Sequence, residues 1–151
     1  MSGWYNGYSP GERRAKSSLR RAGTVSIPPA QSPCELCGDA DSRVKYHSED
    51  YSKPYSWDAP AVYALYRLCH ARLHQRFRAP HKWEAFKALV RRGYYARETR
   101  AKRLEKFLRL GPRYQWPELG RRLRLRSSDG WWERLTTCPE SRRSPWARPR
   151  P

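Results

Sequence analysis

The most informative part of this sequence opens with CELCG at 34–38 and closes with CHARLH at 69–74. The opening sets the thiols of Cys34 and Cys37 in a tight turn, where both can point at one ion, and the following Gly38 relieves the backbone. In the closing run, His70 and His74 stand one helical turn apart and share a face, on which two imidazoles can hold one metal. No thioredoxin-like strand and helix surround the first pair, so the pattern favours a metal knuckle over a redox site.

Outward from this stretch, the apolar spacing predicts helices. Between 58 and 77 apolar residues recur at three and four, which predicts a helix over at least the second half, with Asp58 able to cap its start. Pro80 interrupts the pattern and opens a second amphipathic helix that Gly93 ends in a left-handed conformation. A third helix is predicted from 96 to 110, and a short strand over 42–46 should have its partner nearby.

The two ends of the chain differ from this middle. Residues 1–33 hold Gly, Ser, Pro and Arg with almost no Leu, Ile or Val. We expect a disordered basic arm there, because so little apolar burial cannot offset the entropy of ordering. Residues 111–151 are rich in Arg, Trp and Pro, and we expect at most a short helix followed by disorder. The predicted units are thus an arm at 1–33, a metal domain at 34–78, a helical extension packed on it at 79–110, and a tail at 111–151.

Charge is the second strong signal. The 151 residues include 32 Lys and Arg against 14 Asp and Glu, a formal net charge of +18, and only 38% of the chain is hydrophobic. This composition allows one modest folded domain and favours a polyanionic partner, of which nucleic acid is the commonest. A ribosome-like or merely solubilising surface is the alternative. A membrane is not favoured, because no run of about 18 apolar residues occurs. The first thirty residues lack the apolar core of a signal peptide, so we expect a reducing cytoplasm that keeps thiols available to a metal.

These residues resemble a known family. Cys34 and Cys37, the central YHSEDY at 46–51 and the closing CHARLH at 69–74 are similar to treble-clef, HNH-endonuclease-like proteins of small proteobacterial and mobile-element type. The likeness covers roughly 33–95. It implies a small α+β fold, in which a zinc knuckle, a short β-hairpin and a helix form a treble-clef or ββα-metal core followed by two further helices. It also implies a bacterial or phage-infected cytoplasm, with association with the nucleoid as an option.

The resemblance also implies roles for the histidines. Matched by position, His47 corresponds to the general base that activates water, and His70 and His74 to the helical ligands of Mg²⁺ or another divalent metal. The chemistry is that of metal-assisted phosphodiester hydrolysis, in which a neutral imidazole near pH 7 takes the proton. Glu49 or Asp50 is a candidate oxygen ligand of that ion.

The structural zinc has an open fourth ligand. Similar proteins close the site with a second Cys-x-x-Cys, and here Tyr66 stands at the first position of that pair. Cys34, Cys37 and Cys69 remain, so the fourth ligand would be His70, a nearby carboxylate or water. His70 therefore has two competing assignments, to the zinc and to the catalytic ion, and ligand spacing does not choose between them.

Two main functions stay open from the sequence. One is a metal-dependent DNA endonuclease, and the other is a catalytically inactive treble-clef module that binds DNA or RNA or inhibits another protein of a mobile element or phage. A third alternative is binding to an acidic protein or nucleoprotein complex. Basic residues on or beside the predicted helices are the candidates for phosphate contacts. They are Arg67, Arg72, Arg76, Arg91, Arg92, Arg100, Lys102 and Arg103.

Overall fold

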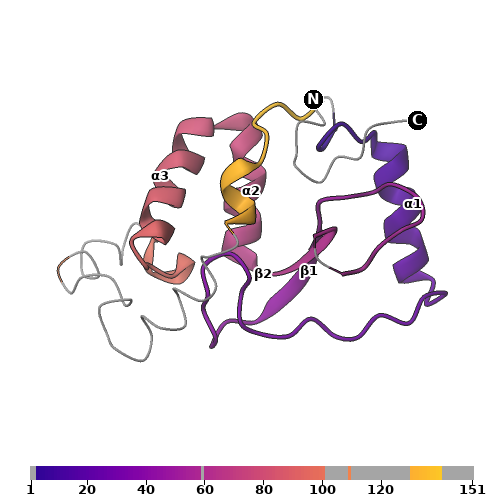
Figure 1. The fold of residues 1–151 in the computed structure, drawn as a ribbon, viewed down its shortest axis with the longest axis horizontal. Helices are drawn as coiled ribbons and strands as arrows, with labels where there is room; N and C mark the ends of the chain where they lie inside the picture. The colour runs from indigo at the N-terminus through magenta and orange to yellow at the C-terminus, as the bar shows by residue number, and fades with distance from the viewer. Residues whose placement is uncertain (1–2, 59, 101–108, 110–129, 141–151) are drawn as a thin grey trace.

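The computed structural model describes residues 3–58, 60–100, 109 and 130–140. Within these residues the chain forms a small α+β fold with three α-helices and one two-stranded sheet, which confirms the predicted fold class at this level (Figure 1). The hairpin lies between α1 on one side and the pair α2 and α3 on the other. The elements in order are α1 (Pro10–Arg21), β1 (Val44–Ser48), β2 (Val62–Tyr66), α2 (Arg67–Arg78), α3 (Pro80–Arg91), and the 3-10 helices η1 (Ala96–Glu98) and η3 (Trp131–Arg134).

The hairpin replaces the first half of the predicted first helix. β1 pairs antiparallel with β2, and His47 faces Tyr63 across the ladder. Every residue of β2 except Tyr66 is buried. A strand covered on both faces loses the alternation of period two, so its apolar run can fit a helical spacing as well. The predicted partner of the 42–46 strand is therefore β2, and the helix begins only at Arg67.

The second predicted helix is confirmed. α3 begins at Pro80 and ends at Arg91, and Gly93 has a φ of 92°, the left-handed conformation expected of a residue that ends a helix. Trp83 and Phe86 of α3 pack in the core beside Leu73 of α2. The predicted third helix begins as the short turn η1, and most of its remaining length lies outside the described residues.

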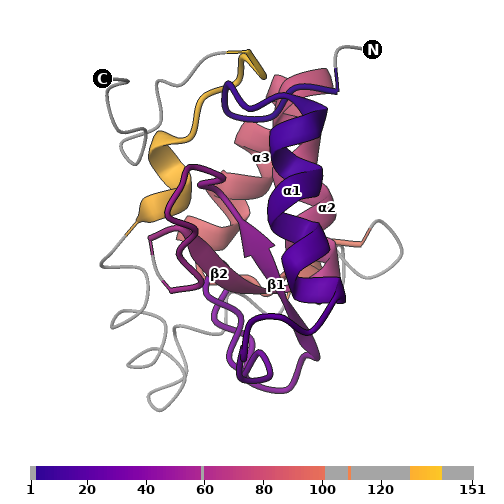
Figure 2. The same cartoon turned by 90° about the vertical axis from the view of Figure 1, so that its right-hand side faces the viewer.

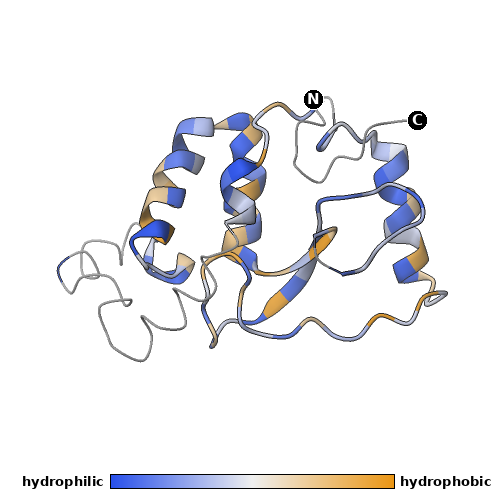
Figure 3. Ribbon diagram, in the orientation of Figure 1, coloured by the Kyte–Doolittle hydropathy of each residue, from blue (hydrophilic) through white to orange (hydrophobic). Residues whose placement is uncertain are grey.

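The prediction of a disordered arm over 1–33 is wrong for the segment that includes α1. This helix begins with Pro10 at its first position and a capping box in which Ser9 and Glu12 exchange hydrogen bonds. Ahead of it, Tyr5 and Tyr8 are 1% and 4% exposed. The segment is held by aromatic packing and side-chain hydrogen bonds, so its lack of aliphatic residues did not make it disordered. Figure 2 shows α1 running along the hairpin, and Figure 3 shows that its ribbon is mostly hydrophilic.

Part of the C-terminal segment is also packed. The Trp131 ring stacks on Tyr63 of β2 at 3.7 Å between centroids, and its indole N–H donates to the carbonyl of Glu35 at 3.0 Å. Trp132 is 2% exposed. The expectation of a disordered tail is therefore corrected for 130–140, because two large aromatic side chains anchor a 3-10 turn on the core. None of the described helices has the length and apolar character needed to cross a membrane.

Candidate functional site

Three thiols converge beneath the hairpin. The sulfur atoms of Cys34, Cys37 and Cys69 lie within 4.8 Å of one another, and all three residues are buried. Cys34 and Cys37 belong to a turn closed by the Gly38 amide, which donates to the Cys34 carbonyl at 2.9 Å, and Gly38 adopts a φ of 80°. Cys69 lies in the first turn of α2. The predicted knuckle of Cys34 and Cys37 thus lies beside the thiol of Cys69, because the antiparallel hairpin between them reverses the direction of the chain.

Burial affects the acidity of all three thiols. Burial raises the pKa of the Cys34 thiol, but contacts with Cys37 and Cys69 and the amide of Tyr66, which donates to Sγ at 3.3 Å, lower it below its usual range. Burial raises the pKa of Cys37 and Cys69. Three sulfurs so close and so buried are compatible with a metal such as zinc. Within the described residues no fourth His, Cys, Asp or Glu joins this cluster.

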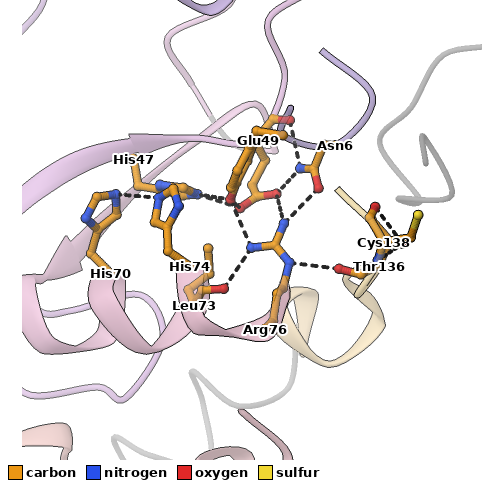
Figure 4. A network of polar contacts seen from close by, with 10 residues as sticks. Asn6, His47, Glu49, His70, Leu73, His74, Arg76, Thr136 and Cys138 are labelled. Atoms are coloured by element: carbon orange, nitrogen blue, oxygen red, sulfur yellow. Dashed lines mark hydrogen bonds and ion pairs between the residues drawn. The ribbon is translucent and has the colours of Figure 1, made fainter. Parts of the chain in front are cut away.

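Three histidines form a second cluster. The nitrogen atoms of His47 from β1 and of His70 and His74 from α2 lie within 4.8 Å of one another. The Nε2 atoms of His70 and His74 are 3.1 Å apart. The three predicted catalytic residues are therefore brought together, and His70 lies with them instead of with the thiols (Figure 4). The expectation that His70 completes the cysteine site does not fit this arrangement.

The two helical imidazoles are neutral near pH 7. Burial, followed by the nearby His47, lowers the pKa of His70 to about 4 and that of His74 to about 2. A neutral imidazole keeps a lone pair that can bind a metal ion. The pair on α2 therefore has the chemistry of a ligand pair, with the i, i+4 spacing that the sequence indicated.

Glu49 orients the third histidine. Nε2 of His47 lies 2.5 Å from Oε1 of Glu49, and both side chains are buried. Burial raises the pKa of Glu49, but the neighbouring Arg76 and His47 lower it by a larger amount. The net result is a pKa of about 2. The ionised carboxylate accepts a hydrogen bond from Nε2 of His47, which leaves Nδ1 as the ring nitrogen that Glu49 does not contact. Glu49 is thus a partner of His47 and Arg76, and the expectation that it holds the ion is not met in this arrangement.

The N-terminal segment supplies the rest of this network. The Tyr5 hydroxyl donates to Oε1 of Glu49 at 2.5 Å, and the Asn6 amide donates to Oε2. Asn6 and Gly7 have φ values of 51° and 75° between the bridged residues Tyr5 and Tyr8. The Asn-Gly dipeptide is a strong short-range signal for a tight turn. It could have indicated that this segment is ordered, but the role of Tyr5 and Asn6 beside Glu49 was not predicted from the sequence.

Arg76 is not where a phosphate contact would be. It is 0% exposed and its guanidinium is shared among protein acceptors. Nη1 donates to the Tyr5 hydroxyl at 3.0 Å, Nη2 to Oδ1 of Asn6 at 2.7 Å, and Nε to the carbonyl of Thr136 at 2.9 Å. Nη2 also lies 3.5 Å from the Glu49 carboxylate. The prediction that Arg76 holds a phosphate is corrected, because the residue is the buried counter-charge of Glu49.

The other basic candidates lie on the outside. Arg67, Arg91, Arg92 and Arg100 are exposed. Arg72 is half-buried and donates to Gln75 at 3.2 Å, and Arg91 forms an ion pair with Glu133 at 2.5 Å. Lys102 and Arg103 lie outside the described residues. These positions leave a dispersed basic surface and do not by themselves define a binding face.

Comparisons with protein-family models, with curated proteins and with solved structures give no match to this chain. The two clusters must therefore be interpreted from their own chemistry.

Proposed function

We propose that this protein is a zinc-stabilised, treble-clef hydrolase that cleaves phosphodiester bonds of nucleic acid with a second, divalent metal ion. The observation that carries the proposal is the meeting of His47, His70 and His74 beside the ionised carboxylate of Glu49. A hairpin histidine facing two histidines one turn apart on the following helix is the arrangement that the resemblance implies for HNH-type endonucleases. DNA is the expected substrate.

The structural zinc belongs to Cys34, Cys37 and Cys69. The three donors are sulfur atoms, which suit zinc, and their burial is typical of a closed structural site. With Tyr66 in place of a fourth cysteine, and no further His, Cys, Asp or Glu of the described residues in this cluster, water would complete the coordination. The small aliphatic core gives such an ion a direct role in folding.

The histidine cluster would carry the reaction. His70 and His74 would hold the divalent ion, which stabilises the charge that builds on the phosphate and on the departing oxygen. His47 would take the proton of the attacking water at Nδ1, while Glu49 holds the opposite ring nitrogen and keeps the imidazole in that tautomer. Tyr5 and Asn6 hold Glu49 in place and act as positioning residues.

A plasmid assay tests this proposal. Purified protein should nick supercoiled plasmid or cut single-stranded circular DNA with Mg²⁺, Mn²⁺ or Ni²⁺, and His47→Ala should lower the rate by about 100-fold or more, the range of a lost general base. His81→Ala is the matched control, because His81 is exposed on α3 and lies outside the cluster. Wild-type protein that cleaves with none of the three metals, or equal rates for the two variants, would refute the proposal.

One observation favours a non-catalytic alternative. His47 is only 3% exposed and Tyr5 lies against it, so the proposed base is largely covered. A treble-clef module that only binds nucleic acid or binds an acidic protein has no need of an accessible His47, so the burial of His47 under Tyr5 is compatible with that function. It should shift DNA or RNA in a gel at low salt, and His47→Ala should leave the shift unchanged.

A further inference from the structure

Helix α1 directs a basic stripe at the histidine cluster. Arg13, Lys16 and Arg20 recur at spacings of three and four, so they lie on one face of the helix, and Arg21 follows at its edge. All four line a pocket of about 480 Å³ whose wall also includes the three clustered histidines. A helix of a folded domain ordinarily places apolar residues on the side that faces the protein. Here that side is cationic.

The charge of this stripe is not neutralised within the pocket. The pocket lining contains no carboxylate, and across the described residues none of the four cations forms an ion pair with Asp or Glu. Lys16 is 1% exposed, and its ammonium donates to the backbone carbonyl of Asp50 at 2.8 Å. Burial lowers the pKa of Lys16 to about 8, opposed by the charge of Asp50, so the ammonium stays protonated at neutral pH. Cations that line one pocket repel one another, and an anionic ligand would relieve that repulsion.

Aromatic faces line the same pocket. Arg20 lies 5.5 Å from the ring centroid of Tyr46, and Lys16 lies 4.9 Å from that of Trp57. Both rings are half-buried and both belong to the pocket lining. Cations interleaved with aromatic rings are the combination by which proteins hold unpaired nucleotides, since the rings stack on bases and the cations follow the phosphates. The pocket volume falls in the range that takes a ligand of nucleotide size.

We propose that this pocket binds single-stranded nucleic acid and delivers its backbone to the histidine cluster. Arg13 and Arg20 would hold phosphates, and Trp57 or Tyr46 would stack on a base. A duplex is disfavoured, because its bases are already stacked on both faces and cannot present one to an aromatic side chain. This inference rests on the proposed function for the identity of the site, and α1 is the element that sets the substrate class.

A binding assay without added divalent metal tests the pocket separately from cleavage. Fluorescence anisotropy would compare a labelled oligothymidylate of about 12 nucleotides, within the usual site sizes for single strands, with a duplex of the same length. The single strand should bind about tenfold more tightly, the scale of one stacked base. The double variant R13Q/R20Q should weaken single-strand binding about tenfold and reduce the slope of log affinity against log salt by about 1.4.

The matched control is R14Q/R78Q, which removes the same charge from α1 and α2 at exposed positions outside the pocket. It should change affinity by less than about threefold, as for distributed surface charge. Trp57→Leu should weaken the single strand alone, while Trp4→Leu, at an exposed position outside the pocket, should not. Circular dichroism would verify that each variant is folded, and if Trp57→Leu is not, the arginine pairs decide.

The outcomes separate the two proposals. Duplex bound as tightly as the single strand, or equal losses for R13Q/R20Q and R14Q/R78Q, would overturn the pocket assignment even if plasmid cleavage is observed. Preferential single-strand binding by a protein that cleaves with no metal would support the pocket and reject the hydrolase.

Discussion

The phenolic oxygen of Tyr5 lies 2.8 Å from Nε2 of His47, although 42 residues separate the two in the sequence. The same hydroxyl donates to Glu49 and accepts from Arg76. The N-terminal segment is therefore part of the candidate site, and the buried charges of Glu49 and Arg76 depend on it for hydrogen bonds.

Replacing Tyr5 by Phe should destabilise the fold and disturb His47 together. The change removes one hydrogen bond from a buried carboxylate and one from a buried guanidinium, which should reduce the free energy of unfolding by about 1–3 kcal/mol. Urea unfolding would measure the loss. Tyr8→Phe is the control, since its hydroxyl donates to the half-buried Asp50, and a loss as large as that of Tyr5→Phe would contradict the central place of Tyr5.

Replacing Arg76 by Met should be among the most damaging substitutions in the described part of the chain. It leaves Glu49 buried without its counter-charge, and breaking a buried pair from one side costs about 3–5 kcal/mol. The double variant R76M/E49Q should recover part of that loss, because the uncompensated charge is gone. Arg78→Met, at an exposed position on the same helix, should change stability by less than about 0.5 kcal/mol in the same chemical melts. Failure of the double variant to recover stability would argue against the pairing.

Acid should weaken the fold through Glu49. Its pKa is about 2 in the folded protein against an ordinary value of 4.5, so the unfolded state binds more protons between these values. The stabilisation is complete above pH 4.5 and is lost as the pH falls toward 2. Melting temperatures across this window should therefore fall steeply for the wild type and less steeply for Glu49→Gln. Glu84→Gln, exposed on α3, should keep the wild-type slope, and parallel curves for all three proteins would refute the assignment.

Removing one clustered thiol should remove a structural metal and the fold with it. Structural zinc supplies on the order of 10 kcal/mol of folding free energy, which is comparable to the whole stability of a small domain. Cys69→Ser should therefore be metal-free by elemental analysis and unfolded by circular dichroism. Cys138→Ser should keep about one zinc per chain, because Cys138 is exposed and lies outside the cluster. A folded, metal-free wild-type protein would contradict the prediction.

The local features of this protein could be predicted from the amino-acid sequence. The turn at 34–38, the shared helical face of His70 and His74, the break at Pro80 and the left-handed Gly93 all follow from short-range rules of spacing and backbone conformation, and the structure has each of them. The small α+β class was an expectation from the resemblance to treble-clef proteins, and the structure has it. Such rules act over a few residues, so the features that they predict do not depend on the rest of the chain.

The contacts between distant groups could not be predicted in this way, because they depend on the whole fold. The placement of His70 with the histidines, the burial of Arg76 against Glu49, the packing of Tyr5 and Asn6 on that pair, and the basic stripe of α1 over the pocket all join segments separated by dozens of residues. The N-terminal segment is basic and poor in aliphatic residues, a composition typical of disorder. It is ordered here because Tyr5 and Asn6 form hydrogen bonds with the buried Glu49 and Arg76, which would otherwise lack these partners. The charge and composition of a segment can be read from its sequence. Its contacts cannot, because they depend on which polar groups of other segments lie beside it in the folded protein.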